Sequence, residues 1–161
     1  MAATCFLNLQ NFIMKRLINF LAITTLLTVV SSCSKDDTPA PVDPNVTFKA
    51  TINGASEVPV NASTATGTAT LIFNQDTKIM TLNLTYTGVT ATNMHIHRGP
   101  AGVSGPVVYG LGSSPFTSPI SYTSPAITVG QQDSLMNNML YVNIHSAAFG
   151  GGEIRGQLLK Q

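Results

Sequence analysis

Beyond residue 45, the pattern of apolar and polar positions predicts short β-strands separated by turns. From Val46 to Ile52 apolar and polar side chains alternate, which is the two-residue period of a half-buried strand. The same period recurs in 67–74 and 78–86, and the turn residues between these two segments predict an antiparallel hairpin. Further strands are expected at 93–97, 107–111, 126–129, 140–145 and 153–159, with a loop at 113–125.

About eight short strands with turns between them are typical of an antiparallel sandwich or barrel. Only 131–138 has the character of a helical turn, so a parallel α/β sheet is not expected. We therefore predict an all-β, Greek-key-like antiparallel β-sandwich of about eight strands with at most one short helix. Alternation assigns six side chains of the later strands to the core: Met94, Ile96, Val142, Ile144, Ile154 and Leu158.

The N-terminal residues have a different pattern, which predicts export. Lys15 and Arg16 precede an apolar run that is shorter than the roughly 20 residues needed to span a bilayer, as in a secretory signal peptide. The sequence Val-Ser-Ser-Cys at 30–33 resembles the lipobox at which a bacterial signal peptidase cuts before a lipid-carrying cysteine. We expect residues 1–32 to be the signal peptide, with Met14 as an alternative start, and Cys33 to be lipidated.

Between the expected lipid anchor and the folded domain lies a tether at 33–45. Three of the seven residues from Thr38 to Pro44 are prolines, which favours a stiff, extended segment. The polar residues 34–37 resemble the signal that sends some Gram-negative lipoproteins to the outer face of the outer membrane. We expect an outer-membrane lipoprotein, exposed at the cell surface or facing the periplasm, whose folded domain is 46–160.

Charge and cysteine content exclude several classes of function. Only 9% of the residues are charged, and loss of Lys15 and Arg16 leaves six basic and seven acidic side chains. No basic face for nucleic acid is therefore expected. If Cys5 is removed and Cys33 is lipidated, no thiol remains for a disulfide, a nucleophile or a thiolate metal site.

The three histidines of the chain are candidates for a metal site. His95 and His97 lie two residues apart on a predicted strand, so their side chains point the same way, roughly 6.5 to 7 Å apart, and are able to share one metal ion. His145 ends another predicted strand, together with Asn143 on the same face. If these two strands are neighbours, a third imidazole joins the first two and the site suits copper or zinc.

A purely structural role for the same residues is the alternative. Paired histidines on a strand also bond backbone carbonyls or a carboxylate, such as that of Glu57 or Glu153. The guanidinium of Arg155 is able to bridge a carboxylate and so fasten two loops. Under this interpretation Glu57, Asn143, Glu153 and Arg155 form a polar structural cluster, and no metal is required.

Five motifs, in order, resemble those of the chordin-type domain called CHRD, and the resemblance spans Val46 to Leu159. They are TINGASEVP at 51–59, MHIHRGPAG at 94–102, GPVV at 105–108, YVNIH at 141–145 and GEIRGQL at 152–158. Pro59-Val60 replaces the usual pair of prolines, and the glycines at 150–152 replace a usual Pro-Gly, so both departures concern loops. The family occurs in bacterial secreted proteins and in chordin, an extracellular growth-factor antagonist, and no catalytic activity is established for the domain.

Two functions are compatible with this sequence. The resemblance implies an extracytoplasmic binding or adhesion module, with an unknown protein or glycan as its ligand. The histidine pattern is similar to that of copper-zinc superoxide dismutase, another β-sandwich, and this favours a metal-binding protein or redox enzyme, although similarity of fold does not establish function. The sequence has no Gly-x-Ser-x-Gly elbow, and no two carboxylates are marked as a catalytic pair, which favours binding over catalysis.

Overall fold

The computed structural model describes residues 40–161. The expected signal peptide, the expected lipidation at Cys33 and most of the tether lie outside the described residues. Within the described part of the chain, no helix is long and apolar enough to cross a membrane. Residues 40–44 lead without regular structure into the first strand, where Asp43 accepts a hydrogen bond from the backbone N–H of Asn45.

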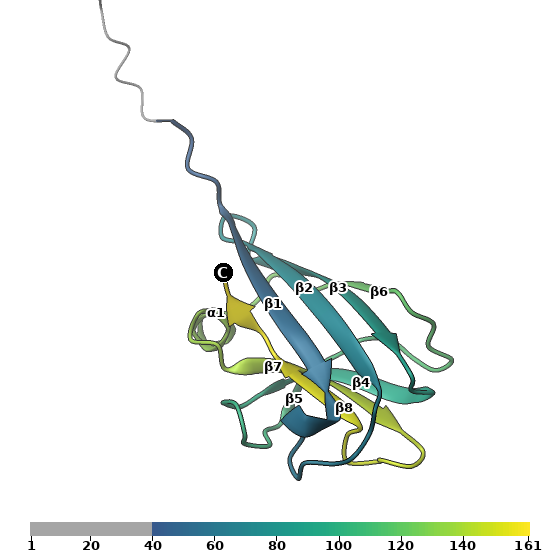
Figure 1. Ribbon diagram of the computed structural model, residues 1–161. Coiled ribbons are helices and arrows are strands. Elements are labelled where there is room, and N and C mark those ends of the chain that lie inside the picture. The colour runs from purple at the N-terminus through teal and green to yellow at the C-terminus, as the bar shows by residue number, and fades with distance from the viewer. Residues whose placement is uncertain (1–39) are drawn as a thin grey trace, which may run out of the picture. The chain divides into compact units, whose positions relative to one another are not determined.

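One layer of the molecule is a meander of long strands (Figure 1). It consists of β1 (Asn45–Asn53), β2 (Thr66–Asn74), β3 (Ile79–Thr87) and the short β6 (Ile120–Thr123). Both β1–β2 and β2–β3 pair in antiparallel register over nine residues. The long uninterrupted alternation in this part of the sequence explains why these three strands are regular from end to end.

The other layer contains β5 (Val107–Gly110), β4 (Ala91–Arg98), β7 (Leu140–Ser146) and β8 (Ile154–Gln157), in that spatial order. β8 pairs with β1, so a single sheet with the order β5-β4-β7-β8-β1-β2-β3-β6 curls over the core, and β9 (Leu159–Lys160) also pairs with β1. The described residues add η1 (Gly54–Ser56) and α1 (Val129–Met136). The prediction of an all-β antiparallel fold with one short helix is confirmed.

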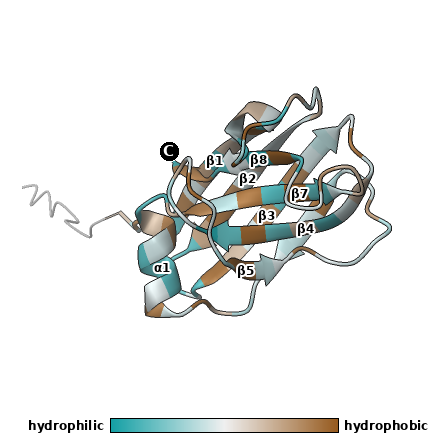
Figure 2. Ribbon diagram, turned by 90° about the horizontal axis from the view of Figure 1, so that it is seen from below, coloured by the Kyte–Doolittle hydropathy of each residue, from teal (hydrophilic) through white to brown (hydrophobic). Residues whose placement is uncertain are grey.

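The core lies between the two layers and is built by the predicted alternation. Figure 2 shows apolar and polar positions alternating along β4 and β7. The six predicted core residues Met94, Ile96, Val142, Ile144, Ile154 and Leu158 are all fully buried. They pack with Phe48, Leu71, Phe73 and Leu82 of the opposite layer in one hydrophobic cluster. The side chains between them must therefore point outward from the β4-β7-β8 layer.

The predicted strand at 126–129 is wrong. The structure instead places β6 at Ile120–Thr123, within the segment predicted to be a loop, and pairs it with β3. Ile127 is buried, and its backbone N–H donates a hydrogen bond to the carbonyl of Lys78. Thr128 caps the N-terminus of α1. Of the apolar residues of 126–129, only Ile127 enters the core, since Ala126 and Val129 are exposed, and the prolines of 113–125 lie outside β6.

Candidate functional site

The three histidines meet because β4 and β7 are antiparallel neighbours. The register pairs His95 with Asn143 and Asn93 with His145. His145 therefore lies diagonally across from His95, on the face that His95 and His97 share. The condition that the sequence left open, that these two strands be adjacent, is fulfilled.

The imidazole rings converge closely. His95 Nδ1 lies 3.2 Å from His145 Nε2, and one ligand nitrogen from each ring lies within 4.8 Å of the other two. The ring centroid of His95 lies 5.4 Å from that of His97 and 5.0 Å from that of His145. His97 is buried, whereas the other two histidines are half-buried. The three rings thus form one cluster, named here the histidine cluster.

Backbone carbonyls determine which nitrogens of the histidine cluster carry a proton. His97 Nδ1 lies 2.9 Å from the carbonyl of Gly105, and His145 Nδ1 lies 3.0 Å from that of Gly150. A carbonyl only accepts, so each Nδ1 donates and each Nε2 of a neutral ring keeps its lone pair. His97 Nε2 is buried and has no hydrogen-bond partner among the described residues. His145 Nε2 therefore accepts the 3.2 Å hydrogen bond from His95 Nδ1, which is the donor in the metal-free protein. The cluster offers Nε2 of His97 and Nε2 of His145 as ligand atoms, and Nδ1 of His95 joins them when its proton moves to the other ring nitrogen.

The surroundings favour the neutral form of two of these imidazoles. Burial lowers the pKa of His95, and the neighbouring His145 and His97 lower it further. Burial also lowers the pKa of His97, where the hydrogen bond to Gly105 opposes the shift and His145 and Arg155 add to it. Neutral imidazole is the form that binds metal ions, so these shifts prepare the cluster for a cation.

Tyr141 holds His97 from the side of β7. Its ring is stacked on the His97 ring, with centroids 5.0 Å apart and an angle of 10° between the planes. The guanidinium carbon of Arg155 lies 3.4 Å from the Tyr141 centroid, in a cation–π contact. The Tyr141 hydroxyl accepts a hydrogen bond of 3.0 Å from Gly105 N–H. Tyr141 lies on the same face of β7 as His145, and the β4–β7 register places it opposite His97.

The predicted polar cluster is buried beside the histidines. Glu57, Asn143 and Arg155 have exposed fractions of 4%, 4% and 2%. Arg155 donates a 2.9 Å hydrogen bond to the carbonyl of Pro100, and no carboxylate of the described chain lies within ion-pair distance of it. Arg155 thus fastens the loop through a carbonyl, and the prediction of a carboxylate bridge is wrong.

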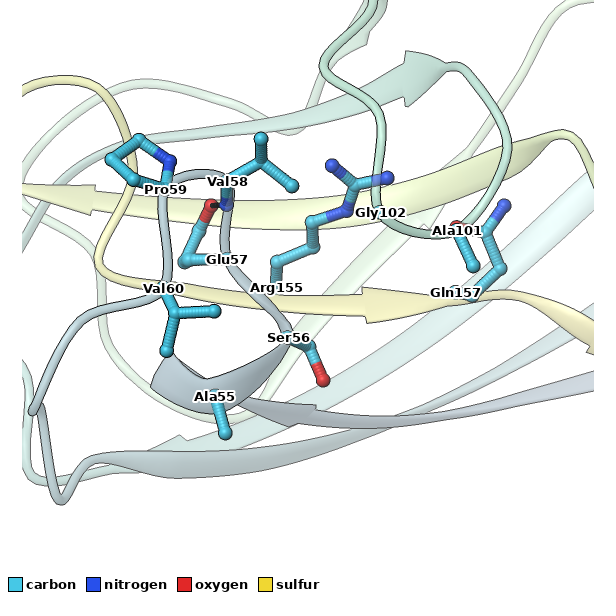
Figure 3. A pocket seen from close by; sticks show the side chains of 10 residues that line it. All are labelled: Ala55, Ser56, Glu57, Val58, Pro59, Val60, Ala101, Gly102, Arg155 and Gln157. Carbon is cyan, nitrogen blue, oxygen red and sulfur yellow. Dashed lines mark hydrogen bonds between the residues drawn. The ribbon is translucent and has the colours of Figure 1, made fainter.

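A cavity of about 490 Å³ lies over this polar cluster, between the segment 55–60 and Ala101–Gly102 (Figure 3). Glu57 and Arg155 line it, and no histidine does. Burial raises the pKa of Glu57, while the Val58 N–H and the charge of Arg155 oppose that shift. The cavity is therefore a separate feature from the histidine cluster.

Glu153 does not join either group. It is 8% exposed, and its carboxylate accepts a 2.7 Å hydrogen bond from Ser63. Its backbone carbonyl accepts another from the Asn61 side chain, so Glu153 holds the loop between β1 and β2. The structural alternative expected the histidines to bond backbone carbonyls or a carboxylate, and the carbonyl form is the one observed, at Gly105 for His97 and at Gly150 for His145.

Comparison with known protein families agrees with the sequence motifs. A family model described as the CHRD domain matches residues 48–158, so the chain belongs to the CHRD family. No curated protein and no solved structure matched the chain. Family membership supports a binding module and leaves its ligand open.

Proposed function

We propose that this protein is an extracytoplasmic binding module, held at the membrane by lipid on Cys33, that binds a copper or zinc ion through His95, His97 and His145. The observation that carries the proposal is the convergence of the three imidazoles, in which the Nδ1 atoms of His97 and His145 bond carbonyls and so leave the lone pairs of their Nε2 atoms available. A ligating histidine usually donates its second ring nitrogen to a carbonyl or carboxylate in this manner.

The spacing of the nitrogens suits a transition-metal ion. Two nitrogens that bind one tetrahedral ion at about 2.0 to 2.1 Å lie roughly 3.3 to 3.4 Å apart. His95 Nδ1 and His145 Nε2 are 3.2 Å apart, while the whole set lies within 4.8 Å. A modest rotation of the imidazoles brings the third nitrogen to the same ion. Imidazole ligands without a thiolate suit zinc and copper, and the general affinity order places copper(II) above zinc.

Metal titration of the mature lipidated protein in detergent tests the proposal. A ligand that binds only the folded state at 100 times its Kd adds about 2.7 kcal/mol to the free energy of unfolding. We expect copper(II) or zinc to raise Tm by several degrees, at one ion per chain. His95→Ala should abolish this shift, because it removes one of the three ligands.

Asn93→Ala is the matched control for His95→Ala. Asn93 lies on the same face of β4 and is the register partner of His145, but it offers no imidazole. This variant should keep the full metal-induced shift. If neither metal raises Tm of the wild-type protein at large excess, the metal proposal fails, and the binding partner to seek is a protein or a glycan.

A further inference from the structure

We propose that the ion bound by the histidine cluster keeps one coordination position open toward solvent and takes a small exogenous donor there, such as water or a small anion. This inference rests on the proposed function, and it adds the class of molecule that the metal itself binds. An open position distinguishes a metal centre that exchanges ligands or reacts from a purely structural metal site. Structural zinc sites have four protein ligands, whereas reactive sites have three and an open position.

The number of available protein ligands supports an open position. Among the described residues, His95, His97 and His145 form the one group of three or more histidine, cysteine or acidic side chains able to hold a metal ion. The two buried carboxylates of the described residues have other surroundings. Glu153 accepts a hydrogen bond from Ser63, and Glu57 lies in the cavity with Arg155. Three imidazoles therefore leave a four-coordinate ion one ligand short.

The burial of the rings shows where the open position lies. His97 is 8% exposed and forms the inner wall of the cluster, with its ring against Tyr141. His95 and His145 are half-buried, so water reaches their side of the cluster. The cavity of about 490 Å³ is lined by Glu57 and Arg155 and by no histidine. The open position thus faces solvent and not this cavity, and the donor expected there is a small species.

Asn143 is the residue that could close the site. It lies directly opposite His95 in the β4–β7 register, and its buried Oδ1 has no partner among the described residues. A Cβ atom at Gly152 would lie 2.7 Å from Asn143 Oδ1 and also 2.7 Å from Glu57 Oε1. The amide therefore lies beside the Glu57 carboxylate, and we assign it to the polar cluster and not to the metal.

Azide binding to the copper-loaded protein tests this inference. The mature lipidated protein in detergent is loaded with one equivalent of copper(II), freed of excess metal and titrated with sodium azide. We expect one azide to bind saturably, with a new azide-to-copper absorption band and conversion of the copper EPR spectrum into a second species. Removal of azide should restore the first spectrum with the copper retained. In Asn143→Ala the azide affinity should stay within about twofold of the wild-type value, since that amide is not a ligand.

Each of the other possible outcomes refutes either the open position or the proposed metal site. If copper binds at one equivalent and the EPR spectrum stays unchanged at a large excess of azide, the coordination is closed and the open position is refuted. If only Asn143→Ala binds azide, the asparagine is the fourth ligand and the inference also fails. If azide strips copper from the protein, the exogenous donor competes with the histidines instead of joining them. Failure to bind copper or zinc at all refutes the proposed function, and the open position with it.

Discussion

Both layers of the sheet carry polar side chains on their outer faces, but the two faces differ in what covers them. On the β1-β2-β3 layer, Thr68 and Thr85 are exposed and share a hydroxyl hydrogen bond of 2.9 Å. On the β4-β7-β8 layer, His97, Tyr141 and Arg155 are 8%, 2% and 2% exposed. The loop that follows β4 forms a hydrogen bond with each of these side chains. The Gly105 carbonyl accepts from His97, the Gly105 N–H donates to the Tyr141 hydroxyl, and the Pro100 carbonyl accepts from Arg155.

This difference shows that alternation of polar and apolar residues does not by itself produce a functional site. Both faces follow the same two-residue period, and the threonine face remains an ordinary solvated surface. On the histidine face, polar rings and a guanidinium are removed from water, so their hydrogen bonds and charges interact strongly and unpaired atoms become costly. Such a face requires a covering loop with donors and acceptors in the right places, and 99–106 supplies them.

The largest expected effect comes from displacing that loop at Gly105. A Cβ at this position would overlap the carbonyl oxygen of Arg98, so Gly105→Ala forces the backbone to move away from His97 and Tyr141. We expect a loss of about 2 to 4 kcal/mol in the free energy of unfolding, measured by urea denaturation. Gly110→Ala is the control, because a Cβ there meets no atom within 4 Å. Equal losses in the two variants would show that the covering loop has no special role.

A smaller effect is expected from single hydroxyl groups on the two faces. Tyr141→Phe keeps the stacked ring but leaves Gly105 N–H without its acceptor, which should cost about 1 to 2 kcal/mol. Thr85→Ala removes the exposed hydrogen bond to Thr68 and should cost about 0.5 kcal/mol or less. Urea unfolding of both variants measures the contrast. If the threonine variant loses as much as the tyrosine variant, the two faces do not differ in the way proposed.

The smallest effect expected is a pH dependence confined to the histidine face. The folded state lowers the pKa of His95 and His97 below the usual 6.5, so the unfolded chain binds more protons once the pH falls below about that value. The metal-free protein should therefore be fully stable above this pH and lose stability on acidification. The raised pKa of Glu57 acts oppositely: its folded state holds a proton above pH 4.5, so its stabilising contribution is lost as pH rises from that value.

Urea unfolding in the presence of a chelator, from pH 8 to pH 5.5, measures this dependence. His95→Gln should flatten the acid decline relative to the wild-type protein, because glutamine does not titrate. Thr85→Ala should leave the slope unchanged, since threonine does not titrate either and lies on the other layer. An acid decline that is equally steep in His95→Gln and in the wild-type protein would contradict the lowered pKa of His95.

Local patterns predicted most of the fold, because each long strand is encoded by its own residues. Alternation is enough to place Met94 and Ile96 in the core and His95 and His97 outside it. It failed at 120–129, where 113–125 was predicted to be a loop and the residues 126–129 were predicted to be a strand. Pairing with β3 decides which of these short segments becomes β6, and that pairing is a long-range contact that short windows do not contain.

For the candidate site, the sequence predicted which side chains share a face of one strand, but not which strands are neighbours. That His145 joins His95 depends on the order of β4 and β7, which lie far apart in the sequence. The hydrogen bonds from the histidines to the Gly105 and Gly150 carbonyls depend on the shape of the loops, which the residue types alone do not predict. Arg155 shows the same limit, because its residue type suggested a carboxylate partner, whereas the loop offered the carbonyl of Pro100.

The position of β1 in the sheet has a mechanical consequence. β1 receives the chain at Asn45 and lies between β2 and β8, with nine register pairs to β2 alone, and the loop that carries Glu57 follows its other end (Figure 1). Antiparallel hydrogen bonds run perpendicular to the strands. A pull on the chain ahead of Asn45, resisted by the neighbouring strands at the opposite end of the sheet, would load the β1–β2 ladder in shear, so its bonds share the force instead of opening one by one.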